Sequence, residues 1–223
     1  RLKKMLSHEV NLIEKRLSRE KHPNKMFFSY ANTVATIDFA KQFKGHGWVG
    51  ISYQIEPDED YNEIILHIRF KETDVRLQQE TLGILGVNLI YGAFYKYNDP
   101  KRLLRYLYDH LDKDQLEIDT INFSGPRFAD VDNRLMSLQL VKNGMTDAVM
   151  FNPDGKNILP AAILYKKNIL AFRGSFRPVT KVNMDMYEKS LKMFLKENKV
   201  EKENTLVIFE ITLSNLRSDG EID

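Results

Sequence analysis

The last quarter of the chain carries the pattern that most restricts its fold: an apolar strand, a turn, an amphipathic helix and a second apolar strand. We expect the strands at residues 168–172 and 205–211 and the helix at residues 183–196. Two strands joined through a helix of this length are predicted to be parallel, with a right-handed crossover. This βαβ unit therefore predicts a fold of the α/β or α+β class.

Strands and helices also alternate over the rest of the chain. Helices are expected where apolar residues recur every three to four positions, and strands where apolar residues alternate or run together. The predicted helices cover residues 1–21, 74–97, 101–111 and 131–142. The predicted strands cover residues 26–37, 44–53 (after a glycine-rich turn), 63–70, 116–123 and 147–151. Together they predict a mixed β-sheet flanked by helices, with the βαβ unit near the C-terminal end.

The longest predicted helix, residues 74–97, has a centre that is apolar on nearly all sides, which predicts a core helix. Its apolar run, residues 81–94, is shorter than the roughly 20 residues that cross a bilayer, so we predict no membrane partner. The tyrosine-rich stretch 91–108 suits a dimer interface, but ordinary core packing explains it equally well. Both a monomer and a homo-oligomer therefore agree with the sequence.

Two interpretations of the domain organisation stay open. The chain forms a single α/β domain over residues 1–223, or it divides near the prolines between 153 and 160 into 1–155 and 156–223. The sequence starts at Arg1 and stops in a polar stretch without an evident end to a fold. We therefore interpret it as part of a longer protein.

Charge and composition exclude several classes of protein. The 33 Lys and Arg residues face 31 Asp and Glu residues, and a formal net charge of +2 does not indicate nucleic acid as a partner, because binding to phosphates normally needs a basic excess. A hydrophobic content of 43% excludes disorder as the default. The absence of cysteine excludes disulfides, thiolate metal sites and cysteine nucleophiles, and it agrees with a cytoplasmic protein.

One segment departs from this charge balance, because residues 166–181 contain lysines and arginines but no acidic residue. Here an apolar strand leads into a helix through a turn with Gly174 and Pro178. Such a turn places backbone N–H groups and the positive end of a helix dipole at the carboxyl edge of a strand. We therefore expect a site for a small anionic ligand, a nucleotide or a phosphorylated metabolite. Its predicted binding residues are Arg173, Gly174, Ser175 and Arg177, with Lys181 adding charge at the helix start.

The same turn resembles the first motif of the nucleotidylyltransferase superfamily, which includes the nicotinate-nucleotide and phosphopantetheine adenylyltransferases. That motif reads Gly-Ser/Thr-Phe-Asp-Pro-Val/Ile-Thr/His-x-Gly-His after the first strand. The matching residues are Gly174, Ser175, Phe176, Pro178, Val179 and Thr180. Three positions depart from the motif: Arg177 replaces the Asp, Val182 replaces the Gly and Asn183 replaces the second His.

Other segments resemble a bacterial family of longer proteins that carry names such as nicotinate-nucleotide adenylyltransferase. These segments are residues 82–94, 123–126, 131–141 and 164–167. The family also carries the name TonB-dependent receptor, which finds no support here because a receptor barrel would show many alternating strands of about ten residues.

This resemblance implies a transferase of NAD biosynthesis, which moves an adenylyl group from ATP to a mononucleotide with Mg²⁺ as cofactor. It implies catalytic roles for Thr180 and Asn183 as phosphate contacts, and for Lys181 in offsetting the charge that develops on the phosphates. The alternative is a non-catalytic module that holds an anionic metabolite or a partner's acidic residues at the same turn.

A second polar cluster lies between a predicted strand and a predicted helix, a position where α/β sheets bind ligands. Asp130 and Asp132 suit a Mg²⁺ ion held together with phosphates. The alternative, which we favour, is an ordinary helix start with Asp130 as the N-cap. The full cluster consists of Ser124, Arg127, Asp130, Asp132, Asn133 and Arg134.

Two of the five histidines, His46 and His67, lie in or beside predicted strands. His46 lies between two glycines and could donate to a phosphate or act as a general acid, although a turn histidine beside Trp48 also has a purely structural explanation. His67 is expected to point out of a half-buried strand. The five histidines show no i, i+4 or His-x-His spacing, so we predict no zinc site.

Overall fold

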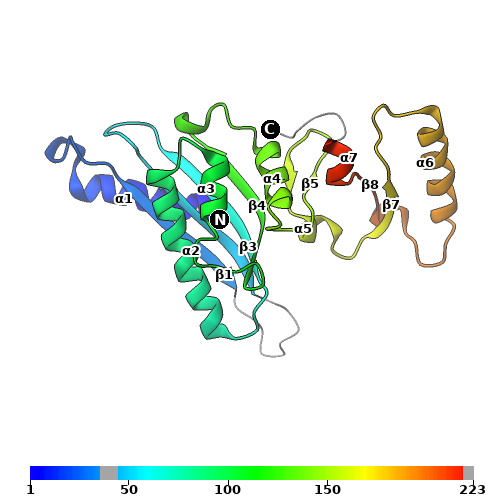
Figure 1. The fold of residues 1–223 in the computed structure, drawn as a ribbon, viewed down its shortest axis with the longest axis horizontal. Coiled ribbons are helices and arrows are strands. Elements are labelled where there is room, and N and C mark those ends of the chain that lie inside the picture. The colour runs from blue at the N-terminus through cyan, green and yellow to red at the C-terminus, as the bar shows by residue number, and fades with distance from the viewer. Residues whose placement is uncertain (36–44, 218–223) are drawn as a thin grey trace. The chain divides into compact units, whose positions relative to one another are not determined.

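The computed structural model describes residues 1–35 and 45–217, and it divides into two compact units, Arg1–Asn157 (unit 1) and Ile158–Asp223 (unit 2) (Figure 1). The predicted α/β class and the C-terminal βαβ unit are confirmed. Within the described residues the antiparallel strands form the main sheet of unit 1, and the parallel pair belongs to unit 2. The mixture of strand directions therefore comes from separate sheets.

Unit 1 is built on a four-stranded antiparallel sheet whose strands lie in chain order. These strands are β1 (Phe28–Ala35), β2 (His46–Tyr53), β3 (Asn62–Phe70) and β4 (Leu116–Ser124). Because successive side chains of a strand point to opposite faces, Ile64, Leu66 and Ile68 enter the main core and Ile65 faces the other side. The pairing of β3 with β4 shifts by one residue after His67, which is a β-bulge.

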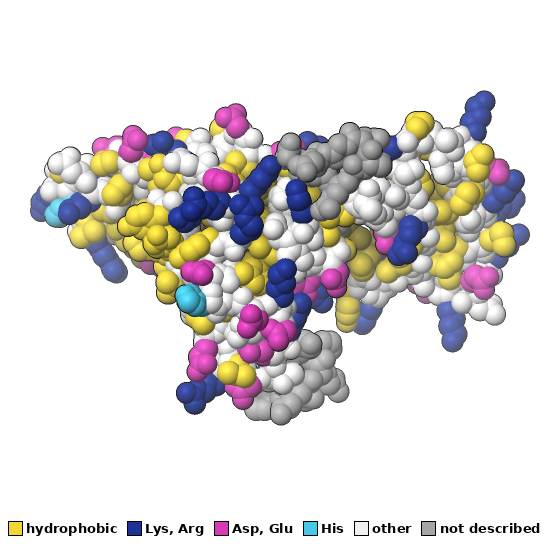
Figure 2. Space-filling view, in the orientation of Figure 1, with side chains coloured by type: hydrophobic (Ala, Val, Ile, Leu, Met, Phe, Trp, Pro, Cys, Tyr) yellow, Lys and Arg dark blue, Asp and Glu magenta, His cyan; other side chains and the backbone are white. Residues whose placement is uncertain are grey.

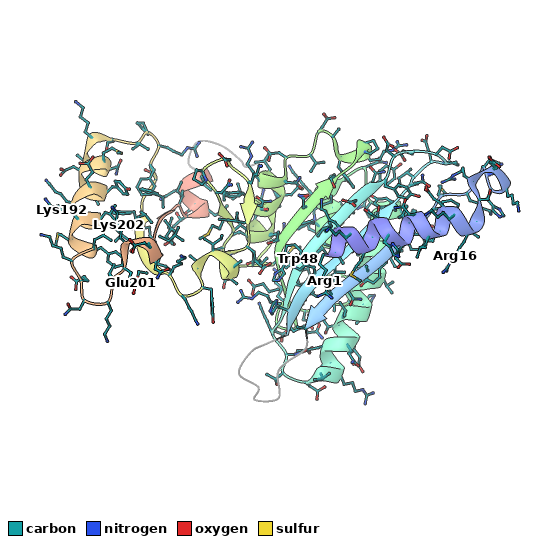
Figure 3. The ribbon with its side chains drawn as sticks, turned by 180° about the vertical axis from the view of Figure 1, so that it is seen from behind. Arg1, Arg16, Trp48, Lys192, Glu201 and Lys202 are labelled. Carbon is teal, nitrogen blue, oxygen red and sulfur yellow. The ribbon has the colours of Figure 1, made fainter. Side chains whose placement is uncertain are left out.

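Helices cover both faces of this sheet. Leu2 and Leu6 of α1 (Leu2–Leu17) are buried against one face, and the view from behind shows this helix crossing the strands (Figure 3). The main core lies on the other face, below α2 (Val75–Tyr95) and α3 (Pro100–Tyr106). The remaining elements of unit 1 are α4 (Asn133–Lys142), which packs on β4, the strand β5 (Met150–Phe151), and single 3-10 turns at Arg19–Lys21 and Pro126–Phe128.

The prediction that residues 74–97 form a core helix is confirmed for one side of α2. One side of the helix is fully buried, with Leu85, Leu89 and Ala93 in the core. On the opposite side, Val87 is 66% exposed and Tyr95 is 70% exposed. One side of α2 therefore packs in the core of unit 1, and its apolar residues continue onto the side that is exposed.

Two further elements are shorter than expected. The helix predicted at residues 101–111 ends at Tyr106 and continues as turns, and the strand predicted at 147–151 is reduced to β5. Strand β6 (Asn157–Ile158) pairs with β5 across a tight turn at Gly155, whose φ of 75° suits glycine.

Unit 2 contains the parallel pair β7 (Asn168–Arg173) and β8 (Thr205–Glu210), joined by α6 (Lys181–Phe194). The rings of Phe172 and Phe209 stack at 5.5 Å, and the ring of Tyr187 on α6 lies 6.1 Å from each of them. This aromatic cluster holds the helix on the strand pair. The remaining elements are α5 (Pro160–Leu164), a 3-10 turn at Lys202–Asn204 and α7 (Leu213–Arg217).

Among the described residues, none of the helices combines the length and the apolar character that a membrane span requires.

Candidate functional site

The predicted anion site lies in unit 2, where residues 173–183 connect β7 to α6; we call this segment the cationic turn. Arg173 ends β7 and lies opposite Glu210, the last residue of β8. Its guanidinium Nη2 forms an ion pair with the Glu210 carboxylate at 2.7 Å, and both side chains are exposed. Arg173 is therefore tethered at the carboxyl edge of the strands, which leaves its remaining N–H groups to a ligand.

The start of the turn is shaped by contacts of Gly174 and Phe176. Gly174 donates its backbone N–H to the carbonyl of Glu210 at 3.1 Å. The ring of Phe176 packs edge-on against Phe209 at 5.1 Å between centroids, and a Cβ added to Gly174 would lie only 3.1 Å from that ring. Phe176 itself has a positive φ of 52°. The chain therefore folds back tightly here, and Ser175 and Arg177 beside Phe176 are exposed.

The start of α6 is closed by a capping box formed by Thr180 and Asn183. The Thr180 hydroxyl accepts the N–H of Asn183 at 3.2 Å, and the Asn183 side-chain oxygen accepts the N–H of Thr180 at 2.8 Å. These two side chains, to which the resemblance assigns phosphate contacts, therefore already bond to each other and to the helix start. The N–H groups of Lys181 and Val182 belong to the same first turn, where the helix dipole favours an anion.

The second polar cluster is explained by structural contacts. The guanidinium of Arg127 forms ion pairs with Glu56 and Glu59, and these hydrogen bonds raise its pKa. The backbone N–H of Arg127 donates to the side-chain oxygen of Asn62 at 2.8 Å. Ser124 donates to Glu63 over a long 3.4 Å. These contacts fix the loop after β4 to the loop before β3.

Asp132, and not Asp130 as we favoured, is the N-cap of α4. Its carboxylate accepts the backbone N–H of Arg134 at 2.8 Å and forms an ion pair with the Arg134 guanidinium at 2.6 Å. The hydrogen bonds from Arg134 lower the pKa of Asp132 to about 2. The amide of Asn133 bonds to both backbone groups of Phe123, so the helix start is tied to β4. Within residues 1–35 and 45–217, no three His, Asp or Glu side chains come together as a metal site.

The role of Asp132 can be tested by its removal. Asp132→Ala is expected to lower the free energy of unfolding by about 1 kcal/mol, the usual contribution of an N-cap, while Asp130→Ala should change little. Because the pKa of Asp132 is lowered in the folded state, this stabilisation is present above the unfolded pKa of about 4 and is lost as the pH falls towards 2.

Urea unfolding of the full chain, followed by the fluorescence of Trp48, measures this difference, since Trp48 is the single tryptophan and lies in unit 1. Equal losses for the two aspartate variants, or a difference that persists at pH 2, would contradict the capping role.

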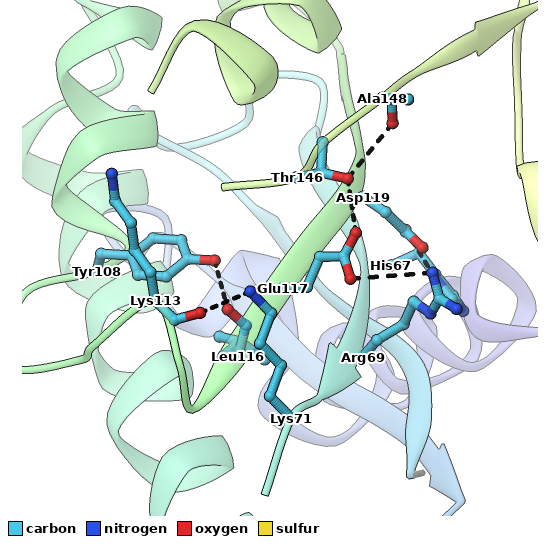
Figure 4. Close-up of polar contacts among 10 residues, drawn as sticks. All are labelled: His67, Arg69, Lys71, Tyr108, Lys113, Leu116, Glu117, Asp119, Thr146 and Ala148. Carbon is cyan, nitrogen blue, oxygen red and sulfur yellow. Dashed lines mark hydrogen bonds and ion pairs between the residues drawn. The ribbon is translucent and has the colours of Figure 1, made fainter. Parts of the chain in front are cut away.

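A third polar group, which the sequence did not predict as a unit, lies on the face of the unit 1 sheet. His67 is buried, with 2% of its surface exposed, so the prediction that it points outward is wrong. Its Nδ1 lies 2.7 Å from the carboxylate of Asp119, which is itself 5% exposed (Figure 4). The ring of Trp48 packs against the His67 ring at 4.9 Å. The imidazole is therefore held by one carboxylate and one indole.

The β-bulge explains how this pair forms. β3 residue His67 pairs with Thr120 and the next residue, Ile68, pairs with Ile118, so Asp119 is the extra residue of β4. Nearby, Thr146 in the segment after α4 donates to Glu117 of β4 at 2.6 Å, and Glu117 lies 3.9 Å from Arg69 of β3 (Figure 4). His46, the other histidine of interest, is exposed at the start of β2 with its ring 5.5 Å from that of His67. Residue 44 of its predicted loop lies outside the described residues.

The sequence candidates therefore form three groups: the cationic turn in unit 2, and the polar cluster at the start of α4 and the histidines of the sheet in unit 1. Comparison of the chain with protein-family models, with curated proteins and with solved structures found no match.

Proposed function

We propose that the cationic turn of unit 2 binds the phosphate groups of a nucleotide. The observation that carries this proposal is the position of three exposed basic residues, Arg173, Arg177 and Lys181, between the carboxyl end of β7 and the start of the 14-residue helix α6. Phosphate oxygens at this position would meet backbone N–H groups, the positive end of a helix dipole and guanidinium donors at once. No other part of the described chain combines these three elements with the motif resemblance of residues 174–180.

The reaction that the motif resemblance supports is adenylyl transfer from ATP to a mononucleotide. Lys181 and Arg177 would hold the phosphates and offset the negative charge that develops during transfer. Thr180 and Asn183 would act indirectly, since their capping box fixes the helix start that presents the N–H groups. Within the described residues no three His, Asp or Glu side chains come together, and no step is assigned here to the Mg²⁺ that the resemblance implies.

Nucleotide binding can be measured by titrating the full chain with ATP in a calorimeter. Arg177→Ala and Lys181→Ala are each expected to raise the dissociation constant about tenfold or more, because each removes a charge-assisted hydrogen bond worth about 1.5–3 kcal/mol. Lys192→Ala is the matched control, since Lys192 lies in the last turn of the same helix and is exposed. Absence of ATP binding, or equal affinities for all three variants, would contradict the proposal.

Pyrophosphate release separates the two functions that this site supports. A transferase releases pyrophosphate from ATP when nicotinate mononucleotide or nicotinamide mononucleotide is added. Retained ATP binding without release would instead assign the turn to a non-catalytic module that holds an anionic ligand.

A further inference from the structure

The outer face of α2 is an exposed and uncharged strip of helix. We define it by four residues at intervals of four, Gly83, Val87, Tyr91 and Tyr95, which all lie on one side because the helix repeats every 3.6 residues. Tyr91 is 41% exposed, and Val87 and Tyr95 are more exposed still. Hydrophobic side chains gather over the upper part of this helix (Figure 2). No charged residue occurs between Glu80 and Lys96, so the face lacks the polar residues that a solvent-facing helix normally carries.

Among the described residues of unit 1, no contact explains Gly83 on this face. A Cβ at Gly86 would lie 2.8 Å from the Tyr30 hydroxyl, and a Cβ at Gly92 would lie 3.3 Å from Leu103, so packing requires both of those glycines. A Cβ at Gly83 would meet nothing within 4 Å. Glycine in a helix interior costs about 1 kcal/mol relative to alanine, so a notch at this position destabilises the helix without serving a contact to the part of the chain that the structure describes.

We propose that the outer face of α2 binds the same face of a second copy of this chain, with the two helices antiparallel and the twofold axis at Val87. In this arrangement, residues equally far from Val87 face each other. Gly83 of one copy then lies opposite Tyr91 of the other, so the notch receives an aromatic ring. The same register places Glu80 opposite Phe94 of the second copy, two residues before Lys96, whose ammonium lies back over the Tyr91 ring. The face is therefore complementary to itself in both shape and charge.

The aromatic half of this interface is already ordered in one copy. The rings of Tyr91 and Tyr95 stack at 4.6 Å, and the ring of Tyr106 on α3 lies 5.0 Å from Tyr91. The Lys96 ammonium lies 5.7 Å from the centre of the Tyr91 ring and 5.9 Å from that of Tyr106. Rings held by neighbours lose little conformational entropy on association, which favours binding. The Glu80 carboxylate stays exposed while paired with Arg76, so it is available to the second copy.

Sedimentation equilibrium of the full chain tests the association directly. The wild-type chain is expected to form a dimer, and Val87→Glu is expected to leave a monomer because it places two carboxylates together at the axis. Leu17→Glu is the matched control, since Leu17 is an apolar residue of α1 with 45% of its surface exposed and lies far from this face in the sequence. A wild-type monomer at every concentration, or equal dissociation constants for the two variants, would overturn the proposal.

Because the sequence contains no cysteine, a cysteine introduced on this face allows a sharper test. A single Val87→Cys variant can form only a disulfide between two copies, and a residue on the twofold axis has the close Cβ spacing that this bond needs. Oxidation is expected to convert Val87→Cys to a covalent dimer at least about tenfold faster than Leu17→Cys. Equal rates would exclude Val87 as the axis.

A charge exchange tests the direction of the helices. Glu80→Lys and Lys96→Glu are each expected to raise the dimer dissociation constant about tenfold, because the symmetry repeats each unfavourable pair twice. The double variant restores the attraction only if the two residues meet across the interface, so its dissociation constant should return to within about threefold of the wild type. A double variant that is weaker than both single variants would overturn the antiparallel register.

Discussion

Replacement of Asp119 by alanine is expected to lower the free energy of unfolding by about 3 kcal/mol. His67 and Asp119 are 2% and 5% exposed, and their side chains meet at 2.7 Å. The variant would leave the imidazole Nδ1 buried without its acceptor. Removing one partner of a buried polar pair costs far more stability than an exposed pair contributes. The effect should exceed that of any exposed ion pair of unit 1.

Urea unfolding of the full chain followed by Trp48 fluorescence measures this loss at the site itself, because the indole ring packs on His67. Asp119→Asn keeps an oxygen acceptor at the same place and should lose less than Asp119→Ala. Asp114→Ala, an exposed aspartate before β4, should change stability by no more than about 0.5 kcal/mol. If the Asp119 and Asp114 variants lost equal stability, the buried bond would make no net contribution.

A double-mutant cycle isolates the coupling within the pair. The double variant His67→Ala/Asp119→Ala is expected to lose clearly less stability than the sum of the two single variants. Each single variant leaves one buried side chain without its partner, whereas the double variant leaves none. Additive losses would mean that each side chain stabilises the sheet through other neighbours.

The strands of unit 1 could be predicted from the sequence because their apolar residues alternate or run together, but the buried pair could not be predicted from that pattern alone. In β4 the core residues Leu116 and Ile118 are two apart, and Ile118 and Ile121 are three apart. This change of spacing is the signal of the bulge that turns Asp119 towards His67. The partner of Asp119 lies 52 residues away in the sequence, so the contact itself depends on the strand register.

In unit 2, the helix, both strands and the turn were predicted correctly because each depends on neighbours in the sequence. The capping of α6 is also local, since Thr180 and Asn183 are three residues apart, although the motif resemblance implies phosphate contacts for the same two residues. For α2 the reverse holds: an apolar composition predicts that a helix is covered, but it does not say whether the cover is the same chain or another. Its exposed face is visible only in three dimensions.

Gly125→Ala is expected to have the largest effect on stability, a loss of about 4 kcal/mol. Gly125 has a φ of 106°, which side-chain-bearing residues rarely adopt, and a Cβ there would lie 2.6 Å from both the Cα of Asn62 and the carbonyl oxygen of Tyr61. The backbone strain and the overlap each contribute roughly 1–3 kcal/mol. The overlap cannot be relieved by a side-chain rotation, because the atoms that it meets are backbone atoms at the start of β3.

Gly155→Ala separates these two contributions. Gly155 also has a positive φ, 75°, but its Cβ would lie no closer than 3.4 Å to the flexible side chain of Arg134. The free energy of unfolding of Gly155→Ala should therefore fall only by the cost of backbone strain, about 1–2 kcal/mol. The difference between the losses at Gly125 and Gly155 then gives the cost of the backbone overlap. Asn62 also accepts the N–H of Arg127, so displacement of Gly125 would weaken that bond as well. Equal losses at Gly125 and Gly155 in urea unfolding would mean that the loop after β4 shifts freely, and that the contacts of Arg127 do not fix it to β3.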